Sequence, residues 1–147
     1  MVSTSLRSRR VFVDSSAYLA LRDRRDEHHQ LAVSIFTRLA QLRFRQFTSN
    51  IIMFEAHSLI LSELGIENGQ AFLREMEESN TVVVNVRQLE EEQAKQIVYT
   101  YSDKDFSLVD ASSFLVMGRL GITYAFTFDR HFNQYGFIQL TPDILVA

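Results

Sequence analysis

The sequence predicts an α/β fold in which helices pack on a mostly parallel sheet. Short segments rich in β-branched and aromatic residues alternate along the chain with longer segments of helical periodicity. The only proline is Pro142, so no proline interrupts this alternation. A length of 147 residues and a hydrophobic fraction of 46% suit a packed core, and no repeat, linker or low-complexity stretch is visible. We therefore expect one domain over residues 1–147.

Five segments are expected to be extended. Residues 11–13 form a continuous apolar run, as in a strand that is buried on both faces. Residues 81–86 are dominated by β-branched side chains, and residues 122–128 and 137–140 each follow a glycine. The last of these is expected to be a short edge strand. Residues 47–48 are the weakest candidate and could be only an extended entry to a helix.

Five longer segments show the three- and four-residue spacing of apolar side chains that predicts helices: residues 27–44, 50–64, 67–79, 88–101 and 108–120. Gly65 and Gly121 directly follow two of them and are typical helix stops. Residues 90–92 are all glutamate, which suits the N-terminus of a helix electrostatically.

The composition excludes several classes of protein. The chain has no cysteine, which rules out a disulfide scaffold, a thiolate zinc site and a cysteine nucleophile. It has no run of about 18 apolar residues, as a membrane helix would need. The arginines of Met1 to Arg10 are followed by only three apolar residues and then an aspartate. This run is too short and too acidic for a signal peptide, so we expect a cytoplasmic protein. A formal net charge of −3, with arginines clustered only locally, argues neither for nor against RNA binding.

Two aspartates stand where predicted strands end. Asp14 follows residues 11–13, and Asp129 follows residues 122–128. In an open parallel sheet, ligands bind beyond the carboxyl ends of the strands, where the strand order switches. Both side chains are therefore expected at the same rim of the sheet.

Two further acids lie on faces of predicted helices that are expected to turn inward. Glu55 shares a helix face with Ile52 and Leu59, and Asp110 shares one with Phe114. An ionised carboxylate beside an apolar stripe is costly unless a partner compensates its charge. One divalent cation could serve several carboxylates at once.

Each acid also has a purely structural interpretation. Asp14 could cap the helix that follows it, and Asp110 could form a capping box at the start of its own helix. Glu55 could bond a buried backbone group or an arginine, and Asp129 could initiate a turn. Four separate coincidences are harder to accept than one cluster. We therefore expect the four acids to meet in one pocket, to bind metal and to carry the catalysis.

The donor set narrows the chemistry of such a pocket. Hard oxygen ligands without cysteine or paired histidine favour Mg²⁺ or Mn²⁺ over Zn²⁺. Carboxylates around one or two such ions can activate water and stabilise an in-line phosphoryl displacement. His28 and His29 are adjacent and cannot share a helix face as zinc ligands do, His57 faces away from Glu55, and a turn or surface role is favoured for His131. No Gly-x-Ser-x-Gly elbow, P-loop or dinucleotide-binding glycine pattern is present.

Together, these segments resemble the motifs of the PIN-domain nucleases, and among them those of the VapC-like toxins of bacterial toxin–antitoxin pairs. The matching segments are Val11 to Ser16, Glu55 within the helix of residues 51–64, Ser107 to Ala111, and Thr127 to Phe132 followed by Gly136 and Phe137. They cover roughly residues 10–140, in the order of the family.

That resemblance implies a three-layer α/β/α sandwich around a mostly parallel sheet and an Mg²⁺- or Mn²⁺-dependent endoribonuclease. Its metal-binding acids would be Asp14, Glu55, Asp110 and Asp129. Ser15, Ser16 and Thr127 fall where the family often has a hydroxyl beside the acids. Asp103 or Asp105 could take the place of Asp110 if the alignment shifts. The resemblance further implies an RNA substrate, a homodimer and a small antitoxin that fills the acidic cleft.

Two other classes of protein remain open. A PIN-like protein without catalysis would bind RNA or a protein partner and would show no metal-dependent cleavage. A phosphatase with an aspartyl nucleophile would also place an acid after the first strand. Asp14 is followed by Ser15 and Ser16, however, so the second aspartate of that pattern is missing.

Overall fold

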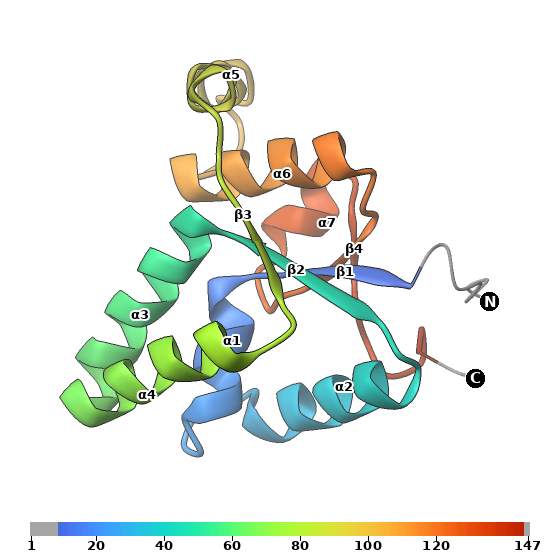
Figure 1. Ribbon diagram of the computed structural model, residues 1–147. Coiled ribbons are helices and arrows are strands. Elements are labelled where there is room, and N and C mark those ends of the chain that lie inside the picture. Colours follow the sequence, from blue (N-terminus) through green and yellow to red (C-terminus); the bar gives the residue numbers. More distant parts are fainter. Residues whose placement is uncertain (1–8, 146–147) are drawn as a thin grey trace.

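The computed structural model describes residues 9–145, in which five strands form one parallel sheet between two layers of helices (Figure 1). The predicted α/β/α layers are thereby confirmed. Arg7 and most of the segment Met1 to Arg10, on which the argument about a signal peptide rests, lie outside the described residues. Within residues 9–145, no helix is long and apolar enough to cross a membrane.

All five strands run parallel, in the order β3-β2-β1-β4-β5. They are β1 (Arg10–Val13), β2 (Arg45–Ser49), β3 (Val82–Val84), β4 (Tyr124–Phe126) and β5 (Ile138–Gln139). The central strand, β1, is almost completely buried, and β5 is the short edge strand that the sequence predicts. β3 and β4 are both shorter than the segments predicted for them.

Residues 47–48 do more than lead into a helix. They belong to β2, which pairs with β1 on one side and with β3 on the other. The strand begins with the polar residues Arg45 and Gln46, so its sequence lacks an apolar run. Its second half is buried, and the Thr48 hydroxyl donates a hydrogen bond to the Val13 carbonyl, 2.8 Å away. This bond lets a polar side chain occupy the core.

Seven helices are present in the described part of the chain: α1 (Ser15–Arg22), α2 (His29–Gln41), α3 (Asn50–Leu64), α4 (Ile66–Glu78), α5 (Gln88–Thr100), α6 (Leu108–Leu120) and α7 (His131–Tyr135). The bounds of α3 and α6 are those that the sequence predicts, α4 differs from prediction by one residue at each end, and α5 ends one residue earlier than predicted. α2 begins two residues later than predicted, and it ends three residues earlier because Arg43, with φ at 58°, adopts a left-handed conformation just before β2. The short α7, which the sequence does not predict, follows the turn at Asp129.

Alternation along β1 divides the core between the two faces of the sheet. Val11 and Val13 pack with Leu39 on the side covered by α1 and α2. Phe12 packs on the other side with Phe114 of α6. Figure 1 shows α5, α6 and α7 above the sheet and α1 to α4 below it. A strand buried on both faces is what the apolar run of residues 11–13 predicts.

The order of the strands reverses between β1 and β4. From β1 the chain adds β2 and β3 on one side of the sheet, and it then crosses over to add β4 and β5 on the other side. Asp14 directly follows β1, and Asp129 lies three residues after β4. Both aspartates therefore stand at the switch point, where an open parallel sheet forms a crevice.

Candidate active site

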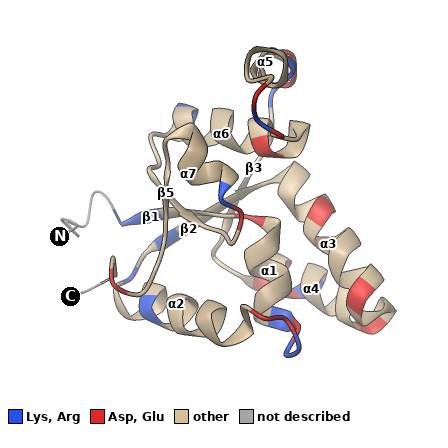
Figure 2. Cartoon of the chain, turned by 180° about the vertical axis from the view of Figure 1, so that it is seen from behind, with Lys and Arg blue, Asp and Glu red and all other residues tan. Residues whose placement is uncertain are grey.

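A pocket of about 370 Å³ opens at the carboxyl ends of β1 and β4. All four predicted acids line this acidic pocket: Asp14 after β1, Glu55 on α3, Asp110 in the first turn of α6 and Asp129 after β4. Figure 2 shows acidic positions of these elements gathered around the ends of the central strands. The structure thus brings the two helix acids to the rim where the sequence placed the two strand-end acids.

Asp14 is held from two sides by hydroxyl groups. Its Oδ2 accepts hydrogen bonds from Ser16 Oγ at 3.0 Å and from Thr127 Oγ1 at 2.9 Å. The residue occupies the N-cap position of α1, but its side chain makes no capping hydrogen bond. The capping interpretation therefore does not explain the orientation of this carboxylate.

Burial dominates the electrostatics of Asp14. The side chain is only 5% exposed, and burial raises the pKa of its carboxyl group to about 6, although the bonds from Thr127 and Ser16 act in the opposite direction. The negative charge of Glu55 raises the pKa further. No lysine or arginine within residues 9–145 pairs with Asp14. Within the described part of the chain, ionised Asp14 is therefore a buried charge without a compensating cation.

Glu55 reaches the acidic pocket from the middle of α3. Ile52 and Ala56 beside it are fully buried, and Glu55 itself is half-buried at the edge of this apolar stripe. The Ser15 hydroxyl donates a hydrogen bond to Glu55 Oε1. Helix α3 packs against α1, which explains how a carboxylate far from Asp14 in the sequence lies across the pocket from it.

Asp110 both caps the start of its helix and lines the acidic pocket. It closes a capping box at the start of α6, in which the Ser107 hydroxyl accepts from the Asp110 backbone at 3.0 Å and Asp110 Oδ2 accepts from the Ser107 backbone at 3.1 Å. It also lines the acidic pocket, and burial raises the pKa of its carboxyl group. The nearby charge of Asp129 acts in the same direction.

Thr127 joins the two strand-end acids. Its hydroxyl donates to Asp14 and accepts from the Asp129 backbone N–H at 3.0 Å. Asp129 Oδ1 in turn accepts from the backbone N–H of His131 at 2.9 Å, as predicted for an aspartate that initiates a turn. Ser15, Ser16 and Thr127 therefore each place a hydroxyl beside one of the acids, as the resemblance implies.

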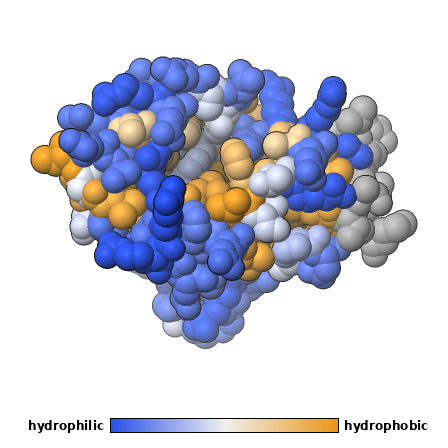
Figure 3. Space-filling model, turned by 90° about the horizontal axis from the view of Figure 1, so that it is seen from below, coloured by the Kyte–Doolittle hydropathy of each residue, from blue (hydrophilic) through white to orange (hydrophobic). Residues whose placement is uncertain are grey.

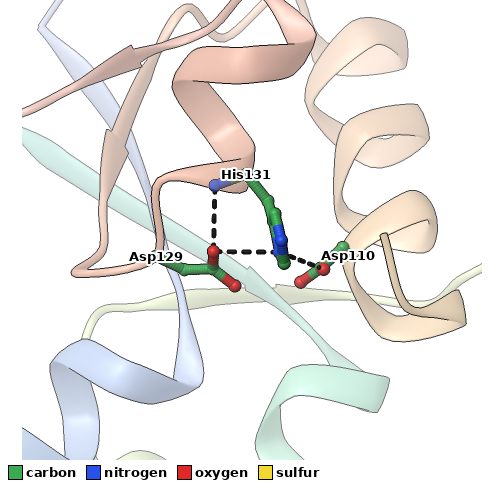
Figure 4. Close-up of side chains that lie close together, drawn as sticks. All are labelled: Asp110, Asp129 and His131. Atoms are coloured by element: carbon green, nitrogen blue, oxygen red, sulfur yellow. Dashed lines mark hydrogen bonds and ion pairs between the residues drawn. The ribbon is translucent and has the colours of Figure 1, made fainter. Parts of the chain in front are cut away.

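His131 lies among the acids, a position that the sequence argument did not give it. Its Nδ1 is 2.9 Å from Asp110 Oδ2 and 3.0 Å from Asp129 Oδ1, and Figure 4 shows the imidazole between these carboxylates. The available signal was its place two residues after Asp129. The turn and the short α7 fold that position back over the acid.

The far side of the His131 ring contacts a fifth acid. Nε2 lies 2.7 Å from Oδ1 of Asp105, which is 82% exposed at its side chain. Burial lowers the pKa of His131, but the bond with Asp105 and the charges of Asp129 and Asp110 outweigh burial, so the pKa is raised. Asp105 lines the acidic pocket, whereas Asp103 does not and instead pairs with Lys104. Neither takes the place of Asp110.

The residues at this end of the pocket fit a divalent cation. One ligand atom from each of Asp110, Asp129 and His131 can be chosen so that all three lie within 4.8 Å of one another. Two carboxylate oxygens and an imidazole nitrogen form a donor set that suits Mn²⁺ as well as Mg²⁺. The unpaired buried carboxylate of Asp14 adds a charge that a cation would compensate.

A larger groove, of about 1380 Å³, lies on the side formed by α1, α2 and α4. Among the described residues, its lining combines arginines with apolar residues, and the one acid there, Glu75, pairs with Arg22. Figure 3 shows the molecule from this side, with apolar side chains gathered amid hydrophilic ones. This groove lacks the carboxylates that phosphoryl chemistry with a hard cation needs.

Comparison with known proteins matches residues 11–138 to the PIN domain. The curated relatives include the 23S rRNA-specific endonuclease VapC20 of two Mycobacterium tuberculosis strains, each 29% identical over 133 residues, which is 90% of this chain and 99% of the relative. A crystal structure of VapC20 from that organism, described as a sarcin-ricin loop cleaving toxin, is 30% identical with a TM-score of 0.83, and the match covers 90% of this chain and 99% of that one. The residues matched to the PIN domain include every residue that lines the acidic pocket.

Proposed function

This chain belongs to the PIN domain family, and from that premise we propose that it is a metal-dependent endoribonuclease and the toxin of a toxin–antitoxin pair. The observation that carries the proposal is the convergence of Asp14, Glu55, Asp110 and Asp129 in one pocket at the switch point of the sheet. The relatives support RNA as the substrate, since VapC20 is named as an endonuclease of 23S rRNA and as a toxin. We infer a cytoplasmic location from such a substrate.

The four acids are proposed to hold Mg²⁺ or Mn²⁺, with the imidazole of His131 beside them. When bound, such an ion lowers the pKa of a water molecule and stabilises negative charge on the phosphate. A site with a histidine nitrogen beside two carboxylates favours Mn²⁺ over Mg²⁺ more than an all-oxygen site does, because nitrogen is a softer ligand than oxygen.

The side chains around the acids would orient them for this chemistry. Thr127 and Ser16 fix Asp14 Oδ2, Ser15 holds Glu55, and the capping box fixes Asp110. Partners of metal ligands restrict the ligands to one rotamer and tune their basicity. Burial excludes water from Asp14, which strengthens every electrostatic interaction of its carboxylate.

Replacing single acids tests the proposed function. Asp14→Asn and Asp110→Asn should each lower Mg²⁺- or Mn²⁺-dependent cleavage of RNA about a hundredfold or more, because even the partners of metal ligands are worth about 10–100-fold. The measurement is initial rates on a labelled RNA, with EDTA as the metal-free reference. Asp103→Asn is the matched control, because this exposed aspartate lies outside the acidic pocket.

Two outcomes would contradict the proposal. Full activity in either variant would remove that carboxylate from the mechanism. A wild-type chain that binds RNA without cleaving it in either metal would favour the non-catalytic PIN-like module. The aspartyl-phosphatase alternative remains disfavoured, because Ser16 stands where its second aspartate would be.

The partners belong to the same proposal. We infer a small antitoxin protein and a homodimer from the family alone. The mass of the purified chain in light scattering would decide between one copy and two.

A further inference from the structure

Two aromatic rings from distant parts of the chain stack at the edge of the acidic pocket. The ring centroids of His28 and Phe128 are 4.5 Å apart, and their planes differ by 3°. His28 precedes α2, and Phe128 lies between Thr127 and Asp129 in the loop after β4. Both residues line the pocket that contains the four acids. We refer to this pair as the aromatic platform.

Phe128, one ring of the platform, is held in place by a second aromatic contact and a hydrogen bond. Phe128 also contacts Phe126 edge to face, with ring centroids 6.1 Å apart, and its backbone N–H donates to Ser16 Oγ at 3.0 Å. The same hydroxyl donates to Asp14. The position of the Phe128 backbone is therefore fixed by the residue that also orients a metal-binding acid.

His28, the other ring of the platform, is also held in place, and its imidazole remains accessible. The backbone N–H of His28 donates to Asp26 Oδ1 at 2.8 Å, and the His28 carbonyl accepts from Ala32 at 2.8 Å, so turn and helix fix the residue. Phe128 covers one face of the imidazole, yet the side chain is still 42% exposed. A flat group arriving at the pocket can therefore stack on the imidazole without a rearrangement of the backbone.

We propose that the aromatic platform binds a base of the RNA next to the scissile phosphate, with His28 as the ring on which that base stacks. The inference rests on the proposed function and adds a substrate-positioning site to it. Unpaired RNA bases stack on aromatic and histidine side chains, and the contact tolerates any base because every base has a π-face. The acids alone would hold a metal-bound phosphate in place and would leave the adjoining nucleotide free to rotate.

Loss of the stacking ring should affect substrate binding more than the chemical step. His28→Ala should raise the KM for a single-stranded RNA about five- to 150-fold and leave kcat within about threefold, because the base contact is made in both the ground and the transition state. His28→Phe should restore most of the affinity, since it keeps a flat ring. Tyr99→Ala is the control for the loss of an exposed aromatic ring outside the pocket.

Fluorescence reports the stacking directly. An RNA with 2-aminopurine beside the cleavage site should be quenched on binding to Asp110→Asn, in which cleavage is suppressed, and not on binding to the double variant with His28→Ala. A KM unchanged in His28→Ala, a loss that appears only in kcat, or equal quenching in both variants would overturn the platform. An inactive wild-type chain would overturn the proposed function instead, and the quenching would still decide whether a base stacks on His28.

Discussion

Asp14 is an acid of the pocket whose ionised form the folded chain destabilises through burial. Its carboxyl group has a pKa of about 6 in the folded chain against an ordinary value of 3.8, with burial as the main cause. A raised acid pKa means that the folded chain binds a proton more tightly than the unfolded chain does. The stabilisation linked to this proton is therefore fully present below pH 3.8 and is lost as the pH rises through about 6.

Asp14→Asn should therefore make the metal-free protein more stable at neutral pH. The shift corresponds to a gain of up to about 3 kcal/mol in the free energy of unfolding at pH 7, because one pKa unit is worth about 1.4 kcal/mol. At pH 3.5 the variant and the wild type should differ little, since the aspartate is then mostly protonated in both states. Urea unfolding in EDTA at both pH values measures this. A variant less stable than wild type at pH 7 would contradict the assignment of Asp14 as a buried, uncompensated charge.

At the residue scale, the sequence predicts which acids could share a pocket better than it predicts the tertiary contacts that bring them there. Asp14 and Asp129 could be placed because a strand end fixes where the next side chain points. Glu55 could be placed only on a helix face, since the packing of α3 against α1 is a tertiary contact that no local pattern encodes. The sequence places neither His28 nor His131 in the pocket, because both positions depend on loops that return to it.

At the scale of elements, the first turn of α6 links stability to the site. Asp110 Oδ2 is shared between the capping box and the imidazole of His131, so the same carboxylate stabilises the start of a helix and lines the pocket. Serine at the N-cap is worth about 1 kcal/mol of stability relative to alanine. A substitution at the N-cap of α6 should therefore lower activity as well as stability.

Ser107→Ala should lower the free energy of unfolding by about 1 kcal/mol, because the Asp110 backbone N–H loses its hydroxyl acceptor. It should also lower kcat severalfold, because the loosened first turn of α6 positions the Asp110 carboxylate less well, although the Ser107 backbone N–H can still donate to it. Ser49→Ala is the matched control: Ser49 Oγ caps α3 through the Ile52 backbone, 3.1 Å away, and lies outside the acidic pocket. Urea unfolding and initial cleavage rates would be compared for the two variants. Equal losses of kcat would mean that Ser107 acts through stability alone.

Helices and strands differ in how well the sequence predicts them. The bounds of α3 and α6 follow from an apolar periodicity followed by Gly65 and Gly121. β2 was nearly missed, because its partners β1 and β3 supply the pairing that its own polar first half does not reveal. Strand identity in a parallel sheet depends on neighbours far away in the sequence.

At the scale of the whole molecule, the fold gathers negative charge at one point. The switch in strand order opens a crevice between β1 and β4. Glu55 of α3 and Asp110 of α6 line this crevice, each from its own helix. Without a cation, the pKa values of Asp14 and Asp110 are both raised, which shows that the folded state disfavours their ionised forms. A ligand that binds only the folded cluster must therefore stabilise the entire fold.

Mg²⁺ or Mn²⁺ should accordingly raise the melting temperature of the wild-type protein at pH 7.5. An ion at a hundred times its dissociation constant adds about 2.7 kcal/mol, which for a chain of this length corresponds to about 5–10 °C. Differential scanning calorimetry with each chloride, against NaCl at equal ionic strength, separates binding from screening. In the double variant Asp14→Asn with Asp110→Asn the shift should vanish, although its metal-free stability should be at least that of the wild type. A shift of the same size in the double variant would place the ion elsewhere, and no shift in the wild type would mean that the acids do not form a metal site in the folded chain.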